Sequence, residues 1–190
     1  MQKPMNFDET KVMNERVQAE VGGHYMRVLR VDERKNKKGG DMIVVCYDFA
    51  DNDKQPRLYQ NEFNGNTDQN KQWPIGGREY INVYDYEGKC SRNFKGFCTS
   101  VEKSNPGFSI DWNLADWGSQ FRGKYIGGVY GNVEDEYNGK VYMRPRLRWF
   151  VANSDVENAK IPQDKLLPAG GYNSYSTTQT PSYNTDDLPF

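Results

Sequence analysis

Alternating apolar and polar residues predict strands along much of the first half of the chain. Three runs rich in β-branched and aromatic residues predict strands, over residues 25–31, 42–49 and 57–63. The polar turn at residues 36–40, with the sequence NKKGG, joins the first two runs as a hairpin. Residues 64–79 are polar and predict a long loop. Residues 9–20 are helix formers that predict a short amphipathic helix, which Gly22 and Gly23 end.

The second half of the chain predicts one helix followed by a hairpin. Four apolar side chains recur at the spacing of one helical face and predict a helix over residues 92–103: Phe94, Phe97, Cys98 and Val101. Pro106 and its neighbours end this helix. Residues 124–136 and 141–151 then alternate with a period of two and predict two strands. The Asn138-Gly139 pair between them favours a tight type I′ turn.

Together these elements predict a mainly β fold. Three strands, a helix and two strands follow one another in the order of the OB-fold, a five-stranded barrel that commonly binds single strands. We therefore expect an OB-fold-like single-strand-binding domain over residues 21–165, preceded by a helical extension at residues 1–20. Residues 166–190 are expected to form a disordered linker that ends in an acidic tip. Other small β-barrels share much of this order, so the order alone does not define the OB-fold.

The composition adds many rings to a very polar chain. The 190 residues include 13 Tyr, 9 Phe and 4 Trp at a mean hydropathy of −0.95, so the rings serve either as core or as a stacking surface. The formal net charge of the chain is −1, but residues 21–152 carry 20 Lys and Arg against 17 Asp and Glu, a net of +3. This mildly basic body is compatible with nucleic acid, since binding needs a local basic stripe rather than a high overall charge.

The cysteine and histidine residues do not form a metal-binding pattern. Cys46, Cys90, Cys98 and His24 lie in different parts of the chain, and no two cysteines have CxxC spacing. We therefore expect reduced thiols, with neither a metal nor another cofactor. No stretch is apolar enough for secretion or for crossing a membrane, which predicts a cytoplasmic protein without a membrane partner.

The last predicted strand carries the strongest candidate for binding. One face of residues 141–151 holds three arginines between two rings: Tyr142, Arg144, Arg146, Arg148 and Phe150. Alternate side chains on a strand are roughly 7 Å apart, which approximates the repeat of nucleic-acid phosphates. The rings would stack on bases. The alternative is a solvated face whose arginines pair with the carboxylates of residues 134–136, but solvated faces more often use Lys and Glu.

Two further groups join this candidate DNA-binding surface. Tyr130, on the neighbouring predicted strand, would add a ring. Lys35, Lys37 and Lys38 lie in the first hairpin turn, where they would fold over a bound strand. A Lys-rich turn also serves solubility alone, so the arginine row is the basis of this prediction.

The carboxyl-terminal residues predict a partner-binding motif on a tether. Residues 169–185 are almost all Gly, Ser, Thr, Tyr, Asn, Gln and Pro without charge, a composition that does not support a packed core. The chain then ends in an acidic and apolar tip: Asp186, Asp187, Leu188, Pro189 and Phe190. Two carboxylates close to a terminal ring suit a basic-rimmed apolar pocket on another protein.

Several segments of the chain resemble a family of small phage proteins. They are NFKGFCTSVEKSNPGF at residues 93–108, FRGKYIGGVYG at residues 121–131 and LRWF at residues 147–150. The family comprises phage single-stranded-DNA-binding proteins, or related OB-fold replication factors, of bacteriophages that infect Gram-positive hosts. The DDLPF ending is similar to the acidic tip of bacterial single-stranded-DNA-binding proteins. The body lacks the usual strand sequences of the bacterial family, so tetrameric assembly is not implied and homo-oligomerisation stays open.

The resemblance implies a non-enzymatic protein that coats single-stranded DNA during phage replication, recombination and repair, in the host cytoplasm. Its tip would recruit replication proteins such as a helicase, a primase or a recombination mediator. Two other functions stay open. A metal-dependent nuclease would use residues 134–136 with Asp111 or Asp116, although no nuclease motif is present. An adaptor would use the tip alone, without affinity for DNA.

Overall fold

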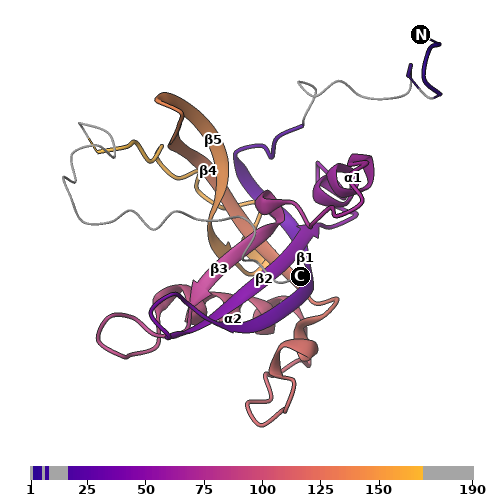
Figure 1. Cartoon of the computed structure of the whole chain (residues 1–190). Coiled ribbons are helices and arrows are strands. Elements are labelled where there is room, and N and C mark those ends of the chain that lie inside the picture. Colours follow the sequence, from indigo (N-terminus) through magenta and orange to yellow (C-terminus); the bar gives the residue numbers. More distant parts are fainter. Residues whose placement is uncertain (1, 6, 9–16, 169–190) are drawn as a thin grey trace.

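The computed structural model describes residues 2–5, 7–8 and 17–168, which contain one five-stranded antiparallel sheet and two α-helices (Figure 1). The elements in chain order are β1 (Gly22–Lys35), β2 (Asp41–Phe49), α1 (Leu58–Gly65), β3 (Arg78–Asn82), α2 (Arg92–Ser104), β4 (Tyr125–Tyr137) and β5 (Lys140–Val151). Two short 3-10 helices lie between these elements, η2 (Ile75–Gly77) and η3 (Trp117–Phe121), and a third, η4 (Asn153–Asp155), follows β5. No helix of this described part is long and apolar enough to cross a membrane.

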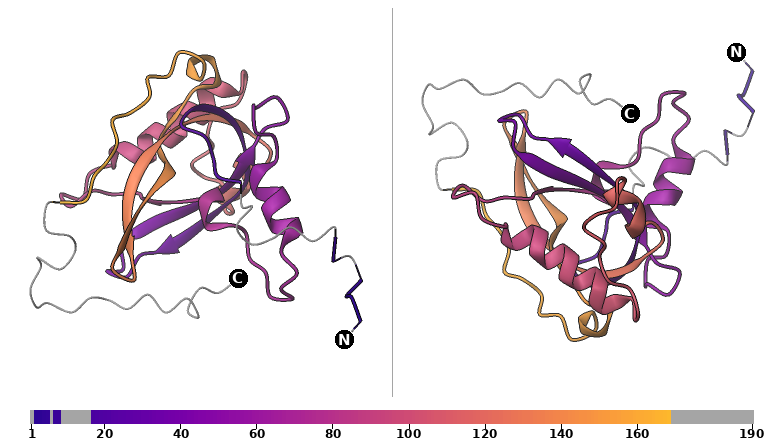
Figure 2. Two further views of the ribbon diagram at one scale, coloured as in Figure 1. Left: turned by 90° about the horizontal axis from the view of Figure 1, so that it is seen from above. Right: turned by 90° about the horizontal axis from the view of Figure 1, so that it is seen from below.

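The five strands are ordered β3-β2-β1-β4-β5 in the sheet, so the first strand of the sequence lies at its centre. This confirms the prediction of a mainly β chain with five strands and a helix between the third and the fourth. Among the described residues, β3 and β5 form no ladder with each other, so the sheet is open and a closed barrel is not seen. Helix α2 contacts both of these edge strands and covers the gap between them (Figure 2).

The two predicted hairpins are present. Residues 36–40 connect β1 to β2, and Asn138 and Gly139 connect β4 to β5. Tyr137 pairs with Lys140, and both turn residues have positive φ, 52° for Asn138 and 71° for Gly139. Positive φ at both central residues is the requirement of a type I′ turn, so this prediction is confirmed.

The prediction for residues 57–63 is wrong, because they begin a helix rather than a strand. Helix α1 follows β2, and the Asp48 carboxylate of β2 accepts hydrogen bonds from the amides of Tyr59 and Gln60, both at 2.9 Å. These are amides of the first helical turn, which have no partner inside the helix. The third strand is instead β3, most of which lies beyond the stretch predicted as a loop.

The predicted helix at the amino terminus is not seen where it can be checked. Residues 9–16 lie outside the described residues, and residues 17–20 are not helical. The end of this segment nevertheless packs on the body of the fold. Ala19 is buried in the core, and the amide of Glu20 donates a hydrogen bond of 2.7 Å to the side chain of Gln55.

The core lies between the sheet and α2, and the helix buries the face that its periodicity predicted. Phe97 and Val101 are fully buried, and the Phe97 ring lies 5.2 Å from the ring of Phe121. The helix begins where the Ser91 side chain accepts a hydrogen bond from the amide of Phe94. An N-cap of this kind satisfies one of the free amides of the first turn.

The segment after β5 packs against β4 at positions where only glycine fits. A Cβ at Gly131 would lie 2.3 Å from Pro162 Cγ, and one at Gly127 would lie 2.5 Å from Val156 Cγ2. Beyond this contact, Lys165 forms a parallel bridge with Val133 at the edge of β4. The glycines of β4 therefore allow a close approach of the chain.

Candidate nucleic-acid interface

A bulge in β5 changes the face on which the predicted binding residues lie. Val129 of β4 pairs with Trp149, whereas the next residue pairs with Leu147, so Arg148 is an extra residue in β5. A bulge of this kind breaks the alternation of side chains. As a result Leu147 and Phe150 both pack against the core, and Trp149 is 42 % exposed.

Phe150 therefore belongs to the interior and not to the predicted stacking surface. Its ring lies 5.3 Å from the ring of Phe97 and 6.2 Å from the ring of Tyr47. The prediction that Phe150 shares an exposed face with the three arginines is wrong, because the period of two does not continue through the bulge at Arg148.

Tyr130 is also buried, and its prediction as a stacking residue is wrong. Its side chain is 1 % exposed. Its hydroxyl lies 2.9 Å from the Tyr47 hydroxyl and 3.1 Å from the Tyr59 hydroxyl, and Tyr47 donates to the carbonyl of Gly76 at 3.0 Å. Burial raises the pKa of Tyr59 to about 12. The three tyrosines form a neutral, hydrogen-bonded group inside the fold.

The three arginines of β5 have different surroundings instead of forming one row. Arg148 donates to the carbonyl of Gln163 at 3.1 Å, which holds the segment that follows β5. Arg146 approaches Asp135 at 3.7 Å. The Arg144 guanidinium lies 5.2 Å from the centre of the Tyr142 ring, and both residues are near the end of the β4–β5 hairpin. Only the Tyr142–Arg144 pair keeps the predicted combination of a ring and a cation at the surface.

The lysines of the first hairpin lie in and beside its turn, as predicted. Lys37 and Lys38 are exposed. Lys35 is the last residue of β1 and pairs with Asp41 at 2.5 Å, so its charge is partly compensated. In Figure 2 the ends of the β1–β2 and β4–β5 hairpins project to the same side of the molecule, and Figure 1 shows β3 between them.

A second cationic surface, which the sequence did not predict, lies across β1, β2 and β3 on the side of the sheet away from the core. We call it the outer face. Three rows of paired residues form it: Arg30–Cys46–Arg78, Asp32–Val44–Tyr80 and Arg34–Met42–Asn82. Their neighbours Val31, Ile43, Val45 and Ile81 belong to the core, which places these rows on the opposite side.

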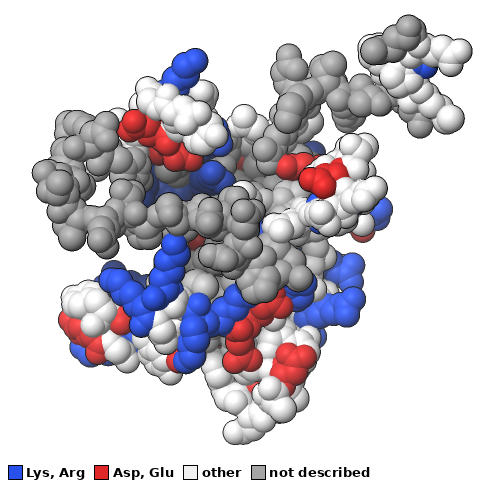
Figure 3. Space-filling view, in the orientation of Figure 1, with Lys and Arg blue, Asp and Glu red and all other residues white. Residues whose placement is uncertain are grey.

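One arginine and one ring are well exposed on the outer face, and the Arg34 side chain is partly exposed, at 27 %. The Arg30 side chain is 55 % exposed, and its Nε lies 3.0 Å from the Asp32 carboxylate, which also lies 3.8 Å from Arg34 Nη2. Tyr80 is 44 % exposed. Arg78 is buried and donates to the carbonyl of Trp73. Figure 3 shows Lys and Arg side chains gathered on the side of the molecule where β3 and the β1–β2 turn lie.

The Cys46 side chain lies buried on the outer face, in the row between Arg30 and Arg78. Burial raises the pKa of the Cys46 thiol, although Arg30 and Arg78 act to lower it. A thiol that stays protonated is a poor nucleophile and a poor metal ligand. Within the described part of the chain, no group of three or more His, Cys, Asp or Glu side chains is arranged to hold a metal ion. The acidic residues of the nuclease alternative are therefore not brought together as a ligand set.

No protein-family model matches the chain, and a search of curated proteins finds no relative. The function must therefore be argued from the geometry of this chain.

Proposed function

We propose that this protein is a non-enzymatic single-stranded-DNA-binding protein with an OB-fold-like domain. The observation that carries the proposal is the outer face, where Arg30 and Arg34 of β1 and the exposed ring of Tyr80 of β3 lie on the same side of the sheet. OB-folds bind oligonucleotides on the face of their second and third strands and with the loops that follow strands one and four. The strand order of this sheet and the position of α2 agree with that fold.

The outer face has the chemistry that a single strand requires. Arg30 and Arg34 would bind phosphates, and the ring of Tyr80 would stack on a base, a contact worth about 1–3 kcal/mol. Asp32 lies between the two guanidinium groups and orients them before the phosphates arrive. The two hairpin ends extend this surface, with Lys37 and Lys38 on one and Tyr142 and Arg144 on the other.

The carboxyl-terminal tip completes the proposal. Residues 186–190 lie outside the described residues, so their sequence alone supports this part. We infer that Asp186, Asp187 and the terminal Phe190 bind a replication or recombination protein, such as a helicase, a primase or a recombination mediator. The cytoplasm of a bacterial host, with the protein encoded by a phage, is the setting that this function implies.

The test is a titration of fluorescent oligo-dT, followed by anisotropy at several salt concentrations. We expect binding that weakens as salt rises, because the protein displaces condensed cations from phosphates, and that does not change when EDTA removes divalent metal. Duplex DNA of the same length should bind much more weakly. Equal affinity for duplex and single strands would refute the proposal, and so would metal-dependent cleavage of the oligonucleotide.

Substitutions locate the binding surface. Tyr80→Ala and the double variant Arg30→Ala/Arg34→Ala should each lower the affinity for oligo-dT at least fivefold, and the double variant should also flatten the salt dependence. The matched control is Lys95→Ala/Lys103→Ala, which removes two exposed cations from α2. If the control lowers the affinity as much as the outer-face variants do, only the net charge matters and the outer face is not the site.

A further inference from the structure

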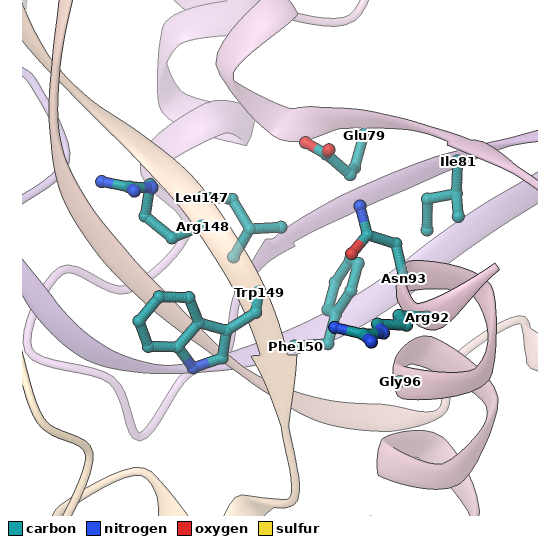
Figure 4. Close-up of a pocket in the computed structure, with 9 residues that line it drawn as sticks. All are labelled: Glu79, Ile81, Arg92, Asn93, Gly96, Leu147, Arg148, Trp149 and Phe150. Carbon is teal, nitrogen blue, oxygen red and sulfur yellow. The ribbon is translucent and has the colours of Figure 1, made fainter. Parts of the chain in front are cut away.

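The edge strands β3 and β5 leave a cleft between them, and the first turns of α2 form its third side (Figure 4). Its inner surface is apolar and consists of Ile81, Leu147 and Phe150. Trp149 lies on the β5 side and is 42 % exposed. Four polar residues line the cleft: Glu79 from β3, Arg92 and Asn93 from α2, and Arg148 from β5, which donates to the carbonyl of Gln163.

The polar side chains that β3 and α2 contribute, those of Glu79, Arg92 and Asn93, have no hydrogen-bond or ion-pair partner among the residues that the structure describes. Glu79 is half-buried, and burial raises its pKa to about 7, against the opposing effect of Arg146. Polar groups withdrawn from water are normally hydrogen-bonded. Glu79 departs from this rule, whereas Arg92 and Asn93 are exposed at the mouth of the cleft, where water solvates them. A ligand that enters the apolar cleft and donates hydrogen bonds to Glu79 would satisfy this carboxylate, and Arg92 and Asn93 are available to bind its other polar groups.

We propose that this cleft binds one guanine base of the single strand. The proposal rests on the single-strand binding proposed above and adds a base preference to it. The Glu79 carboxylate would accept hydrogen bonds from N1–H and the 2-amino group of guanine. The Arg92 guanidinium would donate to O6 and N7, the commonest specific contact of arginine with a base. Leu147 and Trp149 would contact the flat faces of the base.

The donor pattern selects guanine over the other bases. A carboxylate with two acceptor oxygens needs two adjacent donors, and only guanine offers two on its pairing edge. Cytosine and adenine each offer one amino group beside an acceptor nitrogen, which would face the second carboxylate oxygen. Thymine offers a single N–H between two carbonyl groups. One good bidentate contact discriminates by about 1–3 kcal/mol, which corresponds to a preference of about fivefold or more.

The cleft is within reach of a strand on the outer face. Tyr80 and Glu79 are neighbours in β3, so their side chains lie on opposite faces of this edge strand. A strand that stacks on Tyr80 and passes over the free edge of β3 therefore brings its next base to the cleft. Moving one base out of the stack of a single strand costs little free energy, because that base has no pairing partner.

The experiment compares an oligo-dT of about 15 nucleotides with the same oligomer carrying one central guanine, by competition anisotropy at moderate salt. We expect the guanine oligomer to bind about fivefold more tightly. Hypoxanthine in place of guanine should lose much of this gain, because it lacks the 2-amino group. Glu79→Gln should abolish the preference and leave the affinity for oligo-dT unchanged, since an amide offers one acceptor and one donor. The control Glu87→Gln, at an exposed carboxylate after β3, should keep the preference.

The outcomes separate the two proposals. If oligo-dT does not bind at any salt concentration, the proposed function fails and the base site fails with it. If oligo-dT binds but guanine adds nothing, or if Glu79→Gln keeps the preference, single-strand binding stands and the guanine site is refuted. A guanine preference that Glu79→Gln removes and Glu87→Gln keeps supports the site.

Discussion

Replacing Glu79 by Gln should stabilise the protein at alkaline pH. The half-buried carboxyl group has its pKa raised from 4.5 to about 7 by burial, with Arg146 acting in the opposite direction. The folded protein therefore holds this proton more tightly than the unfolded chain does, and the free energy of unfolding falls as the pH rises from about 4.5 to 7. Each pKa unit corresponds to 1.36 kcal/mol. After a discount for partial exposure, the ionised carboxylate costs about 1–3 kcal/mol above pH 7.

The assay is urea unfolding of the wild type and of Glu79→Gln at about pH 8 and about pH 5. Glutamine keeps the shape of the protonated acid and carries no charge, so the variant should be more stable by about 1–3 kcal/mol at the higher pH and by much less at the lower one. Glu87→Gln is the matched control. Its carboxylate pairs with Lys89 at 2.6 Å, which lowers its pKa, so this substitution should give no gain.

A Glu79→Gln variant no more stable than the wild type at about pH 8 would refute the reasoning. The Glu79 carboxylate would then be solvated or paired, and it would give no reason to expect a ligand in the cleft. The expected result has a functional meaning as well. A residue that costs stability and has no partner in the described part of the protein is of the kind found at binding sites, where stability and function oppose each other.

Two further predictions concern the buried histidine pair and the tip. His24 and Asp53 are buried and lie 3.0 Å apart, so Asp53→Asn should cost about 3 kcal/mol or more in urea unfolding at neutral pH. Burial alone would raise the pKa of Asp53, but the contact with His24 lowers it. The stability lost in Asp53→Asn should therefore become smaller in acid, as the pH falls through the pKa of Asp53 in the folded protein. Deleting residues 186–190 should keep or slightly raise the affinity for oligo-dT and abolish capture of a purified helicase, primase or recombination mediator in a pull-down; equal capture by both forms would contradict the recruiting role.

The elements that depend on local sequence were predictable, and those that depend on tertiary contacts were not. Helix α2 carries its apolar side chains at helical spacing and has its own N-cap, Ser91, so its sequence is sufficient. Helix α1 has its first amides bound by Asp48, a residue of β2, and nothing in residues 57–63 reveals this contact. Tertiary interactions of this kind override local propensity.

The candidate site also divides into features that depend on local sequence, which were predictable, and features that depend on tertiary contacts, which were not. The basic and aromatic residues of β5 were visible as a pattern, but the bulge at Arg148 moves Phe150 into the core. Residues 141–151 alternate regularly in sequence, so the sequence does not indicate where the bulge lies. The outer face was missed because it needs β3 in register with β2, and most of β3 lies beyond the stretch predicted as a loop. The alternation of Arg30, Asp32 and Arg34 would have indicated the outer face if the first predicted strand had been extended to Lys35.

The central position of β1 has a consequence for how the chain is made. Its first neighbour, β2, follows directly, but its second neighbour pairs Gly22 with Tyr130, roughly a hundred residues later. The ribosome makes the chain from its amino terminus, so β1 is made long before β4. Until β4 has left the ribosome, one edge of β1 has no partner strand. Pairings so distant in sequence slow folding, and an open edge in the meantime can pair with another chain. The yield of folded protein should therefore depend on how quickly β4 becomes available.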